Sequence, residues 1–219
     1  MKKPPPPTST SEEQVRTLLV RYACPVPFHE VRTRFLGSIA SPGVDISPMK
    51  LVQELWGGEL PEFESLDAAN ELIGALVMGL WNGLSRHQER SAPFRLLRHA
   101  IEPTREELAA LGLMRMQELD GFFHGLFGAD EEVEVPERAS RGLDSLSKMR
   151  TMFAVVVDVA GDKTKPGTIK NIKNMETTLR LLRAITKNAE HEIHAIVLAC
   201  ARSRRQMLAG FMVKKPTSH

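Results

Sequence analysis

Hydrophobic residues recur at helical spacing along most of this chain, and the breaks between such stretches predict where helices end. Over residues 28–40, Val31, Phe35 and Ile39 recur every fourth position, which places them on one face of a helix. A Ser-Pro-Gly turn at 41–43 then stops the helix, because the residue before a proline disfavours helical backbone. The same pattern of apolar periodicity followed by a breaker repeats through the chain.

Capping residues predict where the other helices begin. Thr10 with Glu13 and Thr104 with Glu107 have the spacing of a capping box, in which each side chain bonds a free amide. Ser47 followed by proline, and Ser65, are further start signals. Together with the apolar spacing, these signals predict helices at about 10–23, 28–40, 48–56, 65–83, 104–126, 136–160, 167–188 and 190–212.

Every element predicted in this way is a helix. The β-branched run at 153–157 has the composition of a strand, but a lone strand has no partner in this sequence, so a helix is favoured. Residues 92–101 fit either a short helix or an extended connector. The sequence therefore predicts an all-α fold, a multi-helix single domain with a C-terminal helical pair. Its parts are a disordered Pro-rich tail (1–10), a helical domain (11–161) and a basic helical pair (165–213) packed on or extending it.

Two glycine pairs have different predicted roles. Gly57-Gly58 follows the short helix at 48–56, where a glycine can adopt the left-handed conformation of a helix C-cap. Gly79 and Gly83 lie one turn apart on the next helix and would allow another helix to approach closely. Internal packing is the simpler interpretation of that second pair, and a partner helix is the alternative.

Several motifs in the first half of the chain occur in an order typical of a known family. They are Phe35-Leu36 with Ser41-Pro42, Ile46-x-Pro48, Trp56-Gly57-Gly58-Glu59, Pro61-Glu62-Phe63-Glu64, Trp81-Asn82 and Gly121-Phe122-Phe123-x-Gly125. Over about residues 30–128 the chain resembles the YecA/YgfB-type family of uncharacterised bacterial proteins. The resemblance implies a compact, cytoplasmic, all-helical domain without an established catalytic site. Longer members carry a cysteine-rich zinc-binding tail, whereas this chain has only Cys200 in its C-terminal region.

The aromatic residues of these motifs are expected to be structural. Trp56, Phe63 and Trp81 carry large apolar areas, so we expect them to seal the packing between the short helix and the long one that follows. Gly57, Gly58 and Asn82 complete this predicted structural motif.

Charge is distributed unevenly along the chain, although the net charge is only +2. Residues 51–137 hold 17 acids and 6 bases, whereas residues 138–219 hold 16 bases and 6 acids. Such blocks can attract each other within one molecule or mark a surface for a charged partner. Attraction within the molecule is the favoured interpretation.

A basic stripe is predicted on the helix at 167–188. Lys173, Arg180 and Lys187 recur every seven residues, and Arg183 lies near the same line. An ordinary solvated face is the simplest interpretation. Alternatively, the stripe binds an acidic protein surface or a nucleic acid, although aromatic residues that would stack on bases are missing from it.

No recognised catalytic or cofactor-binding spacing occurs in the sequence. Glu190-His191-Glu192-Ile193-His194 places the second histidine one residue too early for a zinc protease, so a solvated face is favoured there. The acidic loop at 129–135 lacks the alternation of a calcium loop, and Cys24 and Cys200 form no CxxC pair. The sequence predicts no cofactor, metal site or membrane span. It favours a non-catalytic cytoplasmic interaction or regulatory protein with a protein partner. A nucleic-acid-associated protein is the alternative, and a metal-dependent hydrolase using His191 and His194 is the second.

Overall fold

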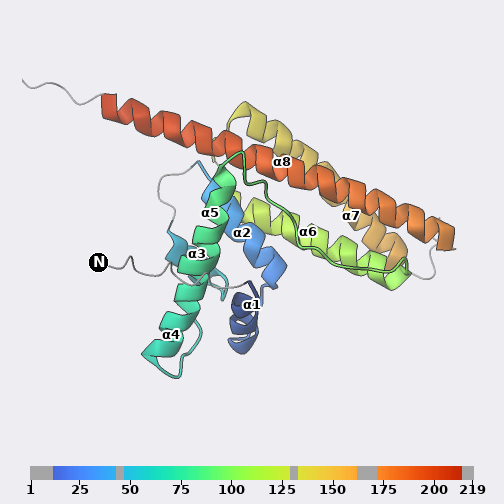
Figure 1. Ribbon diagram of the computed structural model, residues 1–219, viewed down its shortest axis with the longest axis horizontal. Helices are drawn as coiled ribbons and strands as arrows, with labels where there is room; N and C mark the ends of the chain where they lie inside the picture. The colour runs from blue at the N-terminus through green and yellow to red at the C-terminus, as the bar shows by residue number, and fades with distance from the viewer. Residues whose placement is uncertain (1–11, 43–46, 129–132, 162–171, 214–219) are drawn as a thin grey trace, which may run out of the picture.

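The structure is a computed structural model that describes residues 12–42, 47–128, 133–161 and 172–213, with only the backbone described at 172 and 210–213. All regular elements in these ranges are helices, packed into one domain (Figure 1). The predicted all-α class is therefore confirmed. The elements are α1 (Glu12–Arg21), α2 (Phe28–Ala40), α3 (Pro48–Glu54), α4 (Leu66–Ile73), the π-helix η1 (Gly74–Trp81), α5 (Asn82–Ser85), the 3-10 turn η2 (Arg86–Gln88), α6 (Arg105–Phe127), α7 (Glu137–Gly161) and α8 (Ile172–Val213).

Three of the predicted caps are present at the helix starts. The hydroxyl of Ser47 accepts a hydrogen bond from the amide of Lys50, and Ser65 and Thr104 do the same at α4 and α6. Thr10 and the Pro-rich tail lie outside the described residues. The run at 153–157 belongs to α7, as predicted, and α6 continues through Gly112 without a break.

Glycines allow α2 and α6 to cross at very short range. A Cβ atom built on Gly125 would lie 1.9 Å from the carbonyl oxygen of Arg34, and one on Gly37 would lie 2.2 Å from that of Phe122. On Gly121 it would lie 2.7 Å from the oxygen of Glu30. Helix α6 therefore meets α2 backbone to backbone, which gives the Gly-Phe-Phe-x-Gly segment a packing role.

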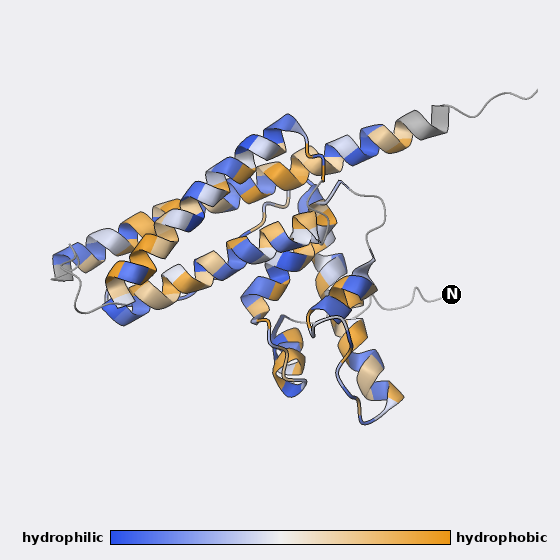
Figure 2. Cartoon of the chain, turned by 180° about the vertical axis from the view of Figure 1, so that it is seen from behind, coloured by the Kyte–Doolittle hydropathy of each residue, from blue (hydrophilic) through white to orange (hydrophobic). Residues whose placement is uncertain are grey.

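The three longest helices lie side by side (Figure 1). Helix α7 packs against both α6 and α8, and α8 also contacts α2. Figure 2 shows hydrophobic and hydrophilic residues along each of these helices, as expected for helices that bury one side. The largest fully buried side chains are Phe35, Phe94, Phe122, Phe153, Leu36, Leu55, Leu72, Leu76, Leu96, Leu108, Leu119 and Leu126.

The C-terminal region is one helix, so the predicted break between 188 and 190 is wrong. Helix α8 runs unbroken for 42 residues, or about 63 Å at 1.5 Å per residue. Ile185, Ala189 and Ile193 are all buried, so the apolar face continues through the expected break. In Figure 1 the end of α8 extends beyond the other helices.

The helix predicted to begin at Ser65 is a helical run, α4, η1 and α5, with a π-helical centre. Wider π turns occupy Gly74–Trp81 between α4 and α5. Gly83 does not meet another helix closely, contrary to the prediction. A Cβ on Gly83 would meet no atom within 4 Å, and Gly79 and Gly83 both border a pocket.

Residues 89–104, here called the strap, connect η2 to α6 without helix or strand. This resolves the ambiguous stretch at 92–101 as an extended connector. Phe94 and Leu96 are buried, while Arg95 between them is exposed, so alternate side chains anchor the strap to the core. Figure 1 shows the strap running along the long helices towards the start of α6.

Candidate functional site: the basic face of α8

Side chains from two helices bind the backbone of the strap. The Leu97 amide donates to Glu118 Oε1 of α6 at 3.0 Å, and Arg115 Nη2 donates to the Leu97 carbonyl oxygen at 2.7 Å. The Leu96 amide donates to Glu190 Oε1 of α8 at 3.1 Å. These bonds replace those a sheet partner would supply, because buried backbone groups need partners.

Glu118 and Arg115 form a buried ion pair beneath the strap. Burial raises the pKa of the Glu118 carboxyl, and the neighbouring Arg115 opposes that rise. Arg115 Nε also donates to the hydroxyl of Thr186 on α8 at 3.3 Å. The pair therefore connects α6, the strap and α8 in one polar network.

Glu190 brings two arginines of the strap to the surface of α8. The Glu190 side chain is 1% exposed and is paired with Arg95 at 2.9 Å and Arg98 at 3.3 Å. The Arg95 and Arg98 side chains are themselves 54% and 72% exposed. Two cations share one carboxylate, so this part of the surface keeps a positive charge.

The predicted basic stripe lies on the exposed side of α8. Within the described residues, the carboxylates of α8 that form ion pairs are Glu190 and Glu192, the latter with Arg138 at 2.9 Å. No ion pair joins the stripe to an acid in the same ranges. Pairing with the acidic middle of the chain, the favoured interpretation of the charge blocks, is made by Arg150 of α7 with Asp120 of α6, but not by the stripe. The exposed stripe residues are Lys173, Arg180, Arg183 and Lys187.

The strap arginines extend this stripe. Arg183 and Glu190 are seven residues apart, so they lie on the same side of α8 about 10.5 Å apart. Arg95 and Arg98, which contact Glu190, are consequently close to Arg183 and Lys187. We call these six residues the basic face: Arg95, Arg98, Lys173, Arg180, Arg183 and Lys187.

An exposed apolar residue lies to one side of the basic face. Leu181 is 55% exposed and follows Arg180 on α8, about 100° further around the helix. The hydroxyl of Thr177 accepts a hydrogen bond from Arg180 Nη2 at 3.2 Å, which orients that guanidinium along the helix. Helix α8 thus presents one oriented cation and, to one side of it, an exposed apolar residue; both kinds of side chain occur in protein interfaces.

The aromatic residues of the predicted structural motif are half-buried and pack against the core. The Trp56 indole donates to the Tyr22 carbonyl oxygen at 2.9 Å, and Phe63 meets the Tyr22 ring edge-on at 5.2 Å between centroids. Trp81 meets Phe35 of α2 edge-on at 5.9 Å. Trp56 thus contacts the segment after α1, and Trp81 contacts α2.

The remaining members of that motif are exposed. Gly57 has a φ of 82° and Gly58 a φ of 108°, which confirms the left-handed conformation predicted after the short helix. Asn82 is exposed on α5, with its amide 3.9 Å from the sulfur of Met78.

The proposed ligands of a hydrolase metal do not converge. Glu190 is buried beneath the strap and already bonded, whereas His191 is exposed. In the described part of the chain, no group of three His, Cys, Asp or Glu side chains could hold a metal ion. Cys24 and Cys200 are free thiols, and burial raises the pKa of Cys200 to about 11. Most of the acidic loop, residues 129–132, lies outside the described residues.

Comparison with known proteins found no matching family model, curated protein or solved structure. Among the helices described, none is long and apolar enough to span a membrane.

Proposed function

We propose that this protein is a non-catalytic binding protein whose basic face docks on an acidic surface of a protein partner. The observation that carries the proposal is that no ion pair joins the stripe to an acid within the described residues, although exposed Glu176 lies on it, while Glu190 and Glu192 of α8 pair with arginines of other elements. Unneutralised cations on one exposed helix face favour an anionic partner.

Two features support a protein partner over a nucleic acid. Leu181 supplies an exposed apolar residue on α8 to one side of the cations, and interfaces between proteins bury apolar contacts at their centre. No aromatic ring belongs to the basic face, whereas single-stranded nucleic acids are commonly bound by stacking on aromatic residues. Binding to a nucleic acid is therefore an outcome that the experiment below must distinguish.

Two matched variants test the proposal. In the first, Arg180, Arg183 and Lys187 are all changed to Gln. In the second, Lys50, Arg141 and Lys148, which are exposed on α3 and α7, are changed in the same way. Both variants lower the net charge by three, so only the location of the charges differs between them. Each protein and the wild type are used for affinity purification from native lysate, with and without nuclease.

The proposal predicts that the α8 variant loses a protein partner that the wild type and the matched control retain after nuclease treatment. Recovery that disappears with nuclease would assign the surface to nucleic acid instead. In that case the log of the affinity would fall with log salt by about 0.7–0.9 per phosphate contacted. Equal partner lists for all three proteins would leave the basic face as a solvated helix surface.

We also infer a distant relationship to the YecA/YgfB-type family. It rests on the Trp-Gly-Gly turn after α3 and on the glycine-phenylalanine segment of α6, both of which occupy structural positions here. That family lacks an established catalytic site, which agrees with the proposed binding role. Superposition on an experimental structure of a family member tests the inference. The inference would be contradicted if the Trp-Gly-Gly turn and the glycine-phenylalanine segment of the family member packed against different elements from those they contact here.

A further inference from the structure

A pocket of about 190 Å³ lies between the start of α1, α2 and the helical run from η1 to η2. At about 30 Å³ per water molecule, it has room for an anion of a few non-hydrogen atoms. It is distinct from the basic face of α8. The residues that line it are Glu12, Val15, Arg32, Gly79, Leu80, Gly83, Leu84, Arg86 and His87.

Arg32 is buried in the wall of this pocket and is poorly satisfied there. The residue is 7% exposed, and its Nε makes no hydrogen bond. Nη1 and Nη2 both donate to a single acceptor, the Arg95 carbonyl oxygen, at a long 3.4 Å. Burial lowers the pKa of Arg32. A buried guanidinium has five donors and requires an anion or several acceptors.

Glu12 partly supplies that anion. Its Oε1 lies 3.0 Å from Arg32 Nε, although the angle does not make this contact a hydrogen bond. The Glu12 side chain is 51% exposed and stands in the first turn of α1. A carboxylate therefore already occupies the position that faces Arg32, and it is half exposed to solvent.

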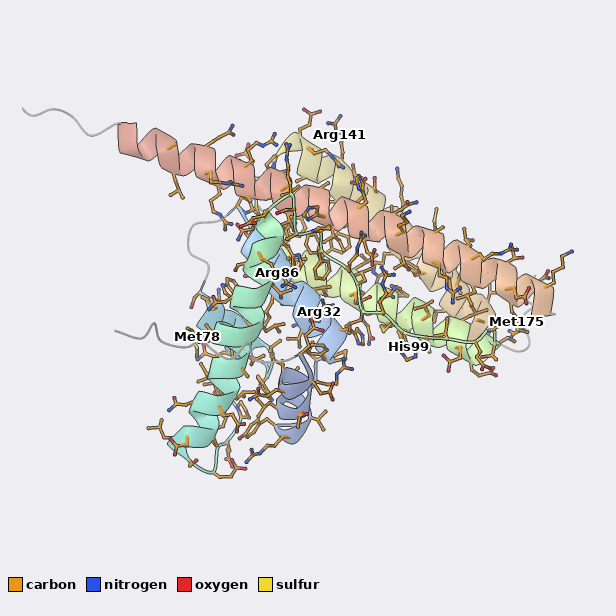
Figure 3. The ribbon with its side chains drawn as sticks, in the orientation of Figure 1. Arg32, Met78, Arg86, His99, Arg141 and Met175 are labelled. Atoms are coloured by element: carbon orange, nitrogen blue, oxygen red, sulfur yellow. The ribbon has the colours of Figure 1, made fainter. Side chains whose placement is uncertain are left out.

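A second arginine lines the same pocket without a carboxylate partner in the described residues. Arg86 is exposed and comes from η2, whereas Arg32 comes from α2 (Figure 3). His87 beside it is buried, and its Nδ1 bonds the Ala92 carbonyl oxygen at 2.7 Å. Burial lowers the pKa of His87, and Arg86 and Arg32 lower it further. Arg32 and Arg86 both line the pocket.

The helical backbone leaves this side of the pocket open. Gly79 of the π-helix and Gly83 of α5 line the pocket here. Because glycine has no side chain, neither residue narrows the pocket. A Cβ on Gly83 would meet nothing within 4 Å, which means the glycine is not needed for packing. π-helical turns are rare and frequently occur at functional sites.

We propose that this pocket binds the carboxylate of a small organic acid, which displaces Glu12 and bridges Arg32 and Arg86. The planar guanidinium matches a carboxylate in geometry and charge. The position of Glu12 shows the geometry in which such a group would meet Arg32.

Titration with sodium acetate and sodium succinate at constant ionic strength tests the proposal. The backbone amide resonances of Gly79 and Gly83 report on the pocket by NMR. We expect saturable shifts with succinate at about 10 mM or below. Glu12→Gln should tighten binding about fivefold, because the internal competitor is removed.

Two further variants locate the binding site. Arg86→Gln removes an exposed cation and should weaken binding about tenfold, while Gly83→Leu fills the pocket and should abolish it. Lys50 is exposed and does not line the pocket, so Lys50→Gln is the matched control for Arg86→Gln and should leave the affinity unchanged. Arg32 is left intact in these tests because its burial would confound binding with folding.

Three outcomes would overturn the proposal. One is the absence of saturable shifts in both the wild type and the Glu12→Gln protein. A second is binding that Arg86→Gln and Gly83→Leu leave unchanged. The third is saturation by inorganic phosphate but not by either carboxylate. None of these outcomes bears on the basic face of α8, so this proposal and the proposed function fail separately.

Discussion

At the scale of single residues, Gly125 limits how closely α2 and α6 approach each other. Gly125→Ala would place a methyl group 1.9 Å from the backbone oxygen of Arg34, and a backbone atom cannot move aside as a flexible side chain can. We expect the free energy of unfolding to fall by at least about 3 kcal/mol, the upper end for overpacking. Chemical denaturation measures it.

The control for Gly125→Ala is Gly83→Ala. The added methyl group meets no atom there, and alanine is favoured over glycine in a helix by up to about 1 kcal/mol. The control should therefore be neutral or stabilising. Equal losses in both variants would show that α2 and α6 do not cross as described.

His87 predicts a pH dependence of stability. Its pKa in the folded protein is lowered by burial from the ordinary 6.5, so the unfolded chain binds the proton more tightly. Its contribution is complete above pH 6.5 and is lost as the pH falls through the lowered value. His87→Gln should reduce the loss of stability between pH 7.5 and 5, by up to about 1.4 kcal/mol per pH unit.

Unfolding midpoints at several pH values measure this difference. His124 and His194 also have pKa values lowered by burial, so part of the pH dependence should remain in the variant. Identical pH profiles for the wild type and His87→Gln would show that His87 is protonated freely in the folded protein.

Trp81 is half-buried, so it should contribute less to the free energy of unfolding than a fully buried aromatic side chain. Its ring packs edge-on against Phe35. Full burial of an aromatic side chain is worth about 3–5 kcal/mol, so we expect Trp81→Ala to cost about 2–3 kcal/mol. The exposed neighbour Asn82 is the control, and Asn82→Ala should change stability by less than about 0.5 kcal/mol. A thermal melt of Trp81→Ala that differs from wild type by only a degree or two would make the ring a candidate binding surface.

At the scale of elements, two buried carboxylates bind the strap, Glu118 of α6 and Glu190 of α8. Their removal should lower the free energy of unfolding by different amounts. Glu118→Leu leaves the buried Arg115 without its anion, and we expect a loss of about 3–5 kcal/mol. Glu190→Leu frees the largely exposed Arg95 and Arg98 to water and leaves only the Leu96 amide unsatisfied. The expected loss is about 1–3 kcal/mol.

Denaturation of both variants, with hydrogen exchange of the strap amides, tests this order. Glu190→Leu should accelerate exchange at Leu96 while the amides of α6 stay protected. A larger loss for Glu190→Leu than for Glu118→Leu would contradict the described roles of the two carboxylates.

The elements show what local sequence signals can predict. Ser47, Ser65 and Thr104 fix helix starts through bonds made within three residues, so the caps were predictable. The continuity of α8 through Ala189 depends on a buried face supplied by other helices, and the π turns of η1 have no comparable local signal. Neither the continuity of α8 nor the π turns of η1 could be predicted from a short stretch of sequence.

The candidate site was predictable only in part. The stripe on α8 follows from seven-residue spacing within one helix. Arg95 and Arg98 join it through Glu190, more than ninety residues away in the sequence. Nothing in the sequence near Arg95 indicates that contact. Glu190 itself was expected on a solvated face, yet it is buried because the strap covers it.

At the scale of the whole molecule, the basic C-terminal region keeps exposed positive charge although the net charge is only +2. Among the described residues, the acids of the middle region do not pair with the basic stripe. This separation of charge leaves α8 with a field that can steer an acidic partner.

The most direct test of the basic face is site-specific photo-crosslinking. A photoreactive aromatic residue replaces Ala184, which is exposed on α8 between Arg183 and Lys187, and separately Ala110, which is exposed on α6. After irradiation in nuclease-treated lysate, mass spectrometry identifies the crosslinked peptides. The account predicts a crosslink to an acidic protein segment from position 184 that is missing from position 110 and is lost in high salt. Crosslinks that are equal at both positions, or a partner segment without acidic residues, would contradict it.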